Sequence, residues 1–359
     1  MNKPKVLAFY LPQFHPTKEN DEWWGKGFTE WTNVGKARRL FPGHYQPRVP
    51  ADLGYYDLRV SETREAQAKM AKEAGIDGFC YWHYWFEDGR ELLQRPFDEV
   101  LSSGTPDFPF CLAWANENWY AKLWDKDGSK DKLLIEQKYD IEDFKKHFYK
   151  VLPAFKDSRY IKIDEKPVFV IYKPLANDLI SVFMDIWNRL AVEEGLPGIY
   201  WVAHCFNSDS NVKKIDEMHF DTLNILSMNG YKDHISILEK GFKKIIRTIF
   251  KMPLIINYNK VVRYLNESVS CSTVISPTIL AGWDHTPRSG TKGTVLNNYN
   301  PNSFRKHVEN VLEIAKSKDS PFIFIKSWNE WAEGNYLEPD LKYGSSYLDI
   351  LREELRERK

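Results

Sequence analysis

Two glutamates follow the last apolar run of the chain, three residues apart. The segment PFIFIKSWNEWAEGNYLEP passes directly from aliphatic and aromatic residues to Glu330 and Glu333, with Trp328, Asn329 and Trp331 beside them. Enzymes that cleave glycosidic bonds use two carboxyl groups, one to protonate the leaving oxygen and one to assist at the anomeric carbon. This spacing lets both side chains reach one cavity from a single turn. Carboxylates at the start of a last helix, favoured by the helix dipole, would give the same pattern.

A third glutamate competes for a catalytic role. Glu117 lies in WANENW, directly after another apolar run. An Asn-Glu pair at a strand end is typical of the acid/base residue in many barrel glycosidases, and Glu330 would then be the nucleophile of an ordinary retaining pair. The distance between the carboxyl groups would decide between the two pairs.

Polar and aromatic side chains also gather at the ends of most other apolar runs. Aromatic faces pack on pyranose rings, while amides, imidazoles, carboxylates and guanidinium groups hydrogen-bond the hydroxyls. One such residue is more often packed than functional, but the coincidence across most runs indicates a carbohydrate site. The candidate substrate-binding residues are Tyr10, His15, Trp82, His83, Trp114, Asn116, Glu117, Tyr172, His204, Trp283, Asp284, Arg288, Trp328, Asn329 and Trp331.

Alternating apolar runs and amphipathic stretches must position these residues. Continuous rather than alternating hydrophobicity in the runs indicates burial on both faces, as in a parallel sheet covered by helices. The sequence therefore predicts one domain over residues 1–359, a (β/α)8 barrel of the TIM type, in which the strand ends converge on one mouth. A doubly wound open sheet is the alternative, but no Gly-rich dinucleotide motif follows the first strand. The predicted strands are 5–10, 77–82, 109–114, 167–172, 199–204, 222–226, 276–282 and 321–328, and the clearest helices are 61–75, 141–155, 178–195 and 303–318.

Some connections are too long to be plain loops. We expect residues 11–60 and 115–140 to build the active-site rim at the C-terminal face. An insertion around 230–270 contains a basic amphipathic helix over 239–252. We favour a barrel helix whose apolar stripe packs on the core; the alternative is a helix that rests on the inner membrane leaflet. The stripe comprises Phe242, Ile245, Ile246, Ile249 and Phe250, and the basic residues Lys243, Lys244, Arg247 and Lys251 lie largely away from it.

Composition excludes some classes of function. Lys plus Arg and Asp plus Glu are both 50, so no global field favours nucleic acid. Neither a metal nor another cofactor is predicted. The N-terminal MNKPKVLAFYLPQF lacks the features of a signal peptide and no run is long enough to cross a bilayer, so we expect a cytoplasmic protein. The cysteines, which lack metal-ligand or redox spacing and which we expect to be reduced, are Cys80, Cys111, Cys205 and Cys271.

The motifs together resemble a known family. The segments FYLPQFHP, GFTEW, GFCYWHYWF, LAWANENW, GWDHTPR and SWNEWAEGNYLEP resemble the WbsX-like proteins of bacterial surface-polysaccharide loci. Those proteins are in turn similar to glycoside hydrolase family 99, the endo-α-mannosidases. The resemblance spans nearly the whole chain.

The resemblance implies a mechanism. In the mannosidase family, one glutamate deprotonates the sugar 2-hydroxyl to form a 1,2-anhydro intermediate, and a second is the general acid/base. The family motif Glu-Trp-x-Glu-Gly falls on residues 330–334, which makes Glu330 the base and Glu333 the acid/base. PQFHP, WANENW and GNYLEP look WbsX-like rather than mannosidase-like, so the resemblance leaves the substrate open. Residues similar to subsite residues are Tyr10, Trp283, Asp284 and Arg288.

We therefore expect a glycoside hydrolase or transglycosidase that acts on an α-linked, α-mannoside-like sugar of a surface polysaccharide or its precursor. The partner expected is an oligosaccharide or polysaccharide, and the sequence does not indicate an oligomeric state. WbsX-like proteins are often labelled glycosyltransferases, so a transferase that uses an activated sugar donor is one alternative. A carbohydrate-binding protein without turnover is another.

Overall fold

The computed structural model describes residues 3–121, 132–205, 209–226, 228, 231, 235–266 and 271–356. In two helices some side chains also lie outside the description, namely those of residues 209, 210, 237, 242–246 and 248.

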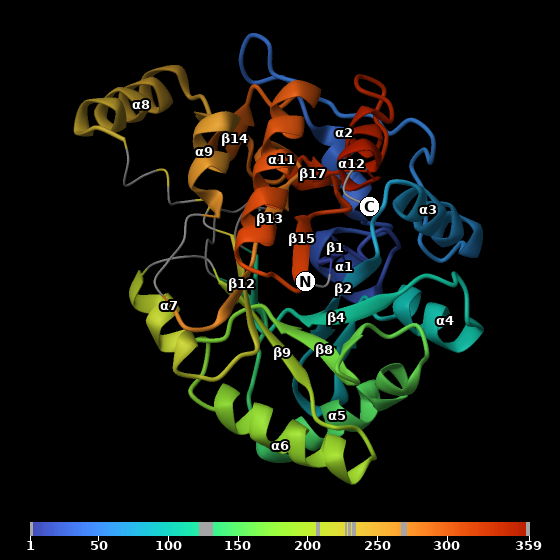
Figure 1. Cartoon of the computed structure of the whole chain (residues 1–359). Coiled ribbons are helices and arrows are strands. Elements are labelled where there is room, and N and C mark those ends of the chain that lie inside the picture. Colours follow the sequence, from blue (N-terminus) through green and yellow to red (C-terminus); the bar gives the residue numbers. More distant parts are fainter. Residues whose placement is uncertain are drawn as a thin grey trace.

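The central sheet is parallel and closes on itself, which confirms the predicted barrel (Figure 1). Its spatial order runs from β12 through β10, β9, β8, β4, β2, β1 and β15 to β13. The first and last of these strands are successive segments separated by Pro277, so β12 beside β10 and β13 beside β15 close the ring. The strands are β1 (Lys5–Tyr10), β2 (Gly78–Trp85), β4 (Phe110–Trp114), β8 (Lys166–Ile171), β9 (Tyr200–Cys205), β10 (Thr222–Ile225), β12 (Val274–Ser276), β13 (Thr278–Leu280) and β15 (Phe322–Lys326).

Helices cover the outside of the barrel, as the periodicity predicts (Figure 1). Each predicted helix agrees with the structure to within two residues at either end. Strand residues are buried on both faces because their inner side chains fill the barrel and their outer side chains meet these helices. The helices are α3 (Ser61–Glu73), α4 (Arg95–Ser103), α5 (Ile141–Lys156), α6 (Ile180–Glu193), α7 (Asp209–Asp216), α9 (Tyr258–Leu265), α11 (Pro301–Ser317) and α12 (Ser346–Arg356).

The long connections carry short elements of their own. The first contains α1 (Lys18–Trp24) and α2 (Glu30–Lys36), and the second contains the antiparallel strands β5 (Trp119–Tyr120) and β6 (Leu133–Ile135). In the insertion after β10, β11 (Leu254–Asn257) pairs with β14 (Thr294–Asn297) of a later loop. The remaining elements are β3 (Glu91–Leu92), β7 (Lys162–Ile163), α10 (Thr286–Ser289), β16 (Asn329–Glu330), β17 (Asn335–Tyr336) and short 3-10 turns. The interpretation of the chain as one domain stays a prediction.

The basic helix of the insertion, α8 (Ile237–Phe250), differs from our favoured interpretation. Figure 1 shows it extending away from the barrel instead of packing along it. Ile249 and Phe250 of the predicted core-facing stripe are exposed, so core packing is wrong for these two residues. The predicted positions of Phe242, Ile245 and Ile246 fall on side chains outside the described residues. Amphipathic periodicity identified the helix but not the surface that its apolar stripe meets.

Gly78 at the start of β2 provides a test of the barrel packing. A Cβ atom there would lie 2.7 Å from the Pro109 carbonyl oxygen and 2.7 Å from Cδ1 of Ile161. We therefore expect Gly78→Ala to lower the free energy of unfolding by about 1–3 kcal/mol, measured by urea denaturation. A Cβ atom at Gly35, in α2, would have no neighbour within 4 Å among the described residues, so Gly35→Ala is the matched control and should be neutral or slightly stabilising. Equal urea midpoints for the two variants would contradict the close strand packing.

Candidate active site

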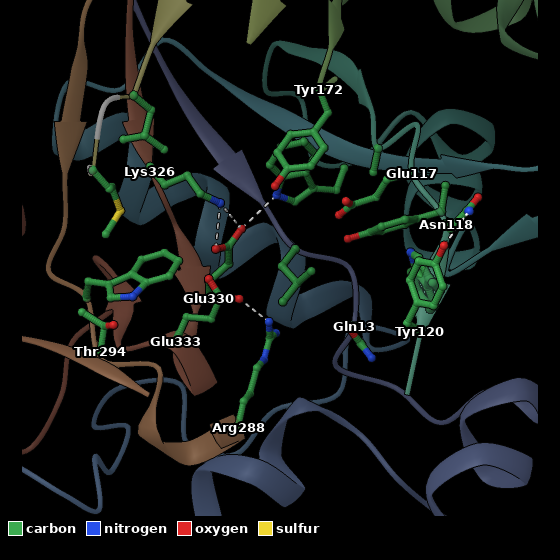
Figure 2. Close-up of a pocket in the computed structure, with 18 of the residues that line it drawn as sticks. Gln13, Glu117, Asn118, Tyr120, Tyr172, Arg288, Thr294, Lys326, Glu330 and Glu333 are labelled. Atoms are coloured by element: carbon green, nitrogen blue, oxygen red, sulfur yellow. Dashed lines mark hydrogen bonds and ion pairs between the residues drawn. The ribbon is translucent and has the colours of Figure 1, made fainter. Parts of the chain in front are cut away.

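A cavity of about 580 Å³ lies at the C-terminal mouth of the barrel, and both predicted catalytic glutamates line it (Figure 2). Its walls come from the ends of the strands and from the long connections that follow them. Many of its lining side chains are aromatic, as the composition of the strand ends predicts. The aromatic residues are Trp24, Trp82, Tyr84, Trp119, Tyr120, Tyr172, Tyr231 and Trp283.

Glu330 is held by a lysine from inside the barrel. Lys326, the last residue of β15, places Nζ 2.8 and 2.9 Å from the two carboxylate oxygens, and Trp82 donates from Nε1 at 2.9 Å. Burial raises the pKa of Glu330, the Lys326 ammonium opposes that rise, and the charge of Glu333 adds to it. The net direction is upward, so Glu330 binds a proton more readily than an ordinary glutamate.

Glu333 has a different environment. The Arg288 guanidinium contacts its carboxylate, and His285 Nε2 lies 3.9 Å away. Burial alone would raise the pKa of Glu333, but Arg288, with His285 and Lys326, outweighs burial and lowers it. The neighbouring carboxyls are therefore driven in opposite directions, which is the pattern expected of an acid and base pair.

Arg288 also binds a second carboxylate, that of Glu30 in α2. Glu30 is fully buried and accepts from Asn33 Nδ2 at 3.4 Å. Burial raises the pKa of Glu30, although Arg288 works against that rise. A single guanidinium thus bridges a buried structural carboxylate and a carboxylate of the cavity.

The turn that carries Glu333 is fixed through its backbone. Asp284 donates its N–H to the Glu333 carbonyl at 2.6 Å. Gly334 follows with φ +57°, and a Cβ atom there would lie 2.7 Å from Asp284 Cβ, so this position requires glycine. The Asp284 carboxylate accepts from His44 Nε2 and Gln46 Nε2, both at 2.8 Å. Burial would raise the pKa of Asp284, but these donors and the Arg48 charge lower it to about 2.

Asn329 ties the end of the last strand to the end of the first. Its Oδ1 accepts from the Leu11 N–H at 2.7 Å, and its Nδ2 donates to the Leu11 carbonyl at 3.0 Å. The amide side chain thus replaces a backbone pair where the two strands diverge. Asn329 lies directly before Glu330, so these contacts fix the backbone from which Glu330 projects.

The structure brings part of the predicted set together. Along with both glutamates, the cavity is lined by Trp82, Glu117, Tyr172, Trp283 and Arg288. Figure 2 shows Glu117 beside Tyr172, across the cavity from Glu333. Glu117 forms an ion pair with Lys173.

Other predicted residues lie behind the cavity or face the helices. Alternation along each strand explains the separation: Trp82 and Tyr84 point inward, whereas His83 points outward to His147 of α5, with Nε2 atoms 2.8 Å apart. Tyr10 likewise faces α3, where its hydroxyl donates to Gln67 at 2.6 Å, so it does not line the cavity.

The remaining candidates are buried in the supporting structure. His204 lies against Tyr172, and its Nδ1 donates to Asn224 Oδ1 at 2.7 Å. The Trp114 indole donates to the Trp85 carbonyl. The Asn116 side chain donates from Nδ2 to the Lys173 carbonyl and accepts at Oδ1 from the Lys173 N–H. Buried positions outside the cavity lining are His15, Trp114, Asn116, His204, Asp284, Trp328, Asn329 and Trp331.

Sequence reasoning missed several residues of the site. Lys326 had a visible signal, because it is a lone cation at the end of the apolar run FIFIK. Glu30 lies in GFTEW, which contributed to the resemblance but was not assigned to the site. Gln13, Tyr84 and Trp119 also line the cavity. Tyr84 does so because alternate side chains of β2 point into the barrel, and the sequence does not show which alternate set that is.

Within the described ranges, no group of three or more His, Cys, Asp or Glu side chains is arranged to hold a metal ion. No helix in the same ranges combines the length and apolarity needed to span a bilayer.

Comparisons with known proteins place the chain among glycan-related proteins. Two curated relatives, both named uncharacterized protein WxcX and from strains of Xanthomonas campestris pv. campestris, are 33% identical over 357 residues. The alignment covers 98% of this chain but 49% of each relative, so the chain spans about half the length of the curated relatives it matches.

Solved structures share the fold. A glycoside hydrolase-like protein superposes with a TM-score of 0.62 at 16% identity, covering 99% of this chain and 94% of the other. The family 99 endo-α-mannosidase of Bacteroides thetaiotaomicron gives a TM-score of 0.56 at 13% identity, over 98% and 96% of the two chains. The family model described as glycosyltransferase WbsX matches residues 6–351, and the chain therefore belongs to that family.

Proposed function

We propose that this protein is a glycan-active enzyme, a retaining glycoside hydrolase or transglycosidase of the cytoplasm. Its substrate is an α-linked, mannoside-like sugar of a bacterial surface polysaccharide or its precursor. The observation that carries the proposal is the pair Glu330 and Glu333, which line one aromatic cavity with pKa values driven in opposite directions. The barrel shared with family 99 supports the same chemistry.

Glu330 acts as the base in this mechanism. It takes the proton of the sugar 2-hydroxyl while the 2-oxygen attacks the anomeric carbon, and Glu333 protonates the departing oxygen. Water, or an acceptor hydroxyl, then opens the 1,2-anhydro ring; Glu333 takes its proton and Glu330 returns a proton to the 2-oxygen. The raised pKa of Glu330 makes its carboxylate a stronger base, and the Lys326 ammonium stabilises that carboxylate before the reaction.

Glu333 must hold a proton to serve as the acid, yet Arg288 favours its ionised form in the free enzyme. A leaving-group oxygen that enters between them would weaken that contact, and burial would then raise the pKa of Glu333. Arg288 would keep a counter-charge during this exchange, because it already pairs with Glu30. The opposite assignment, with Glu330 as acid and Glu333 as base, follows the pKa directions of the free enzyme and is distinguished by the first experiment below.

A glycosyltransferase is the second candidate, and the description of the family favours it. Turnover that requires a nucleotide sugar would support the transferase. Sugar binding without turnover under either condition would support a binding protein, for which the aromatic lining alone is sufficient.

The acid and base can be separated with two substrates. We expect Glu333→Gln to slow cleavage of an α-linked oligosaccharide by at least about a hundredfold, the scale of general acid catalysis. The loss should be much smaller with an α-glycosyl fluoride, because fluoride departs without protonation. Glu330→Gln should lose activity on both substrates, as measured by initial rates.

Glu117→Gln is the matched control, since Glu117 lines the same cavity from another wall. It should reduce the rates less than either variant of the pair. If Glu330→Gln loses activity on the oligosaccharide but keeps it on the fluoride, Glu330 is the acid and the two roles are reversed. The same result for Glu117→Gln would make Glu117 the acid.

The pH profile tests the role of Lys326. A base must be deprotonated, so kcat/KM falls as pH drops through the pKa of Glu330. The Lys326 ammonium lowers the pKa of Glu330, so this pKa should rise in Lys326→Met. The acidic limb of the kcat/KM profile should therefore move to higher pH. Lys326→Arg, which keeps the charge, should move it less, and Lys173→Met, beside Glu117, should leave it in place. An acidic limb that does not move in Lys326→Met would contradict the assignment of Glu330 as the base.

A further inference from the structure

We propose that α8 docks the protein on an anionic lipid bilayer and holds the mouth of the cavity close to that surface. The docking rests on the exposure and charge of α8 and not on the proposed catalytic function. Only the consequence for substrate delivery rests on the latter.

The apolar side of α8 is exposed to solvent. Leu238 is 85% exposed, Ile249 67% and Phe250 66%. Leu238 and Ile249 are about three turns apart and so lie on the same face of the helix, with Phe250 at its edge. Figure 1 shows the helix projecting from the body, which agrees with these exposures. Large apolar side chains gathered on one projecting helix indicate a surface that is covered in use.

The polar side of α8 is basic. Lys240 and Arg247 are exposed and about two turns apart, on the side opposite Leu238 and Ile249, and the exposed Lys251 follows the helix. Glu239 is the one acidic residue from 237 to 251, and it pairs with Lys260 of α9 at 3.3 Å. The sequence contributes two further lysines at 243 and 244.

An anionic bilayer fits this combination. Amphipathic helices with Lys and Arg on one side and Phe, Leu or Ile on the other lie in the interface, where phosphate groups meet the cations. A second copy of the helix would bring like charges together, which disfavours self-association through this face. The contact that we propose is peripheral, because it is made by the exposed side chains of α8.

The position of α8 connects docking to the cavity. Tyr231 precedes the helix, Leu254 and Ile256 of β11 follow it, and all three line the cavity. A membrane that receives α8 would therefore lie beside the cavity rim. If the proposed function holds, a saccharide attached to a lipid could reach Glu330 and Glu333 without leaving the surface.

Vesicle sedimentation of the full chain tests the docking. The probes are vesicles of phosphatidylethanolamine with phosphatidylglycerol, and vesicles of phosphatidylcholine alone. We expect binding to the anionic vesicles that weakens at about 0.5 M salt, because exposed charges are then screened. Reversing Lys240, Arg247 and Lys251 to Glu should weaken it by at least about tenfold, given the contribution of each cation near a charged membrane.

The apolar contribution is tested separately with Leu238→Ser, Ile249→Ser and Phe250→Ser combined, which should also lose binding. A matched control lies on α6, where Val192 is 62% exposed and Arg189 is exposed. Val192→Ser with Arg189→Glu should bind like the unchanged protein. Hydrolysis of a water-soluble glycoside should be the same in all these variants, since none of the substituted residues lines the cavity.

Several results would overturn the docking. They are absence of binding to the anionic vesicles, equal binding to phosphatidylcholine that survives charge reversal, and self-association that the serine variant abolishes in place of vesicle binding. Because vesicle binding is measured without turnover, its failure would leave the proposed function intact, and inactive protein that still binds vesicles would contradict the function alone.

Discussion

The constraint on which the site depends is the burial of several like charges in one small space. Glu30, Glu330 and Glu333 lie close together with only two permanent cations, Lys326 and Arg288, in direct contact among the described residues. Full ionisation would leave this group with an excess negative charge that the protein interior solvates poorly. One bound proton removes the excess, which agrees with the raised pKa of Glu30 and Glu330. A cluster that retains one exchangeable proton is suited to acid and base catalysis.

The charged groups come from different parts of the fold, so their arrangement depends on the surrounding structure. Lys326 ends β15, Arg288 follows β13, and Glu30 lies in the first long connection. The closed barrel brings these segments to one mouth. The buried hydrogen bonds of Asn329 and Asp284 then fix the turn that carries Glu330 and Glu333. Rigid placement lowers the reorganisation that charge transfer would otherwise require.

Much of the fold was predictable from the sequence, because apolar runs and helical periodicity are local signals. The pair Glu330 and Glu333 was predictable for the same reason, since both residues lie on one short turn. The inward and outward sides of YWHYW could not be assigned, because a continuously apolar strand conceals its alternation. Glu30 was missed because its partner Arg288 is remote in sequence, whereas Lys326 was overlooked although its partner Glu330 lies four residues away. The interpretation of α8 was wrong for Ile249 and Phe250 because a periodic pattern does not specify its partner.

The division between the barrel and its rim also bears on specificity. The proposed catalytic groups project from the ends of the strands and from short turns, whereas Trp119, Tyr231 and Ile256 reach the cavity from long connections and from the insertion. Changes in such connections leave the barrel closure and the charge cluster intact, so under the proposed function they would alter the outer sugar contacts at little cost to the central chemistry. WANENW, one of the segments that depart from the mannosidase pattern, leads into such a connection. We therefore propose that the mechanism given above operates at the bond that reacts, and that the substrate differs from that of the mannosidases in the sugars that the rim contacts.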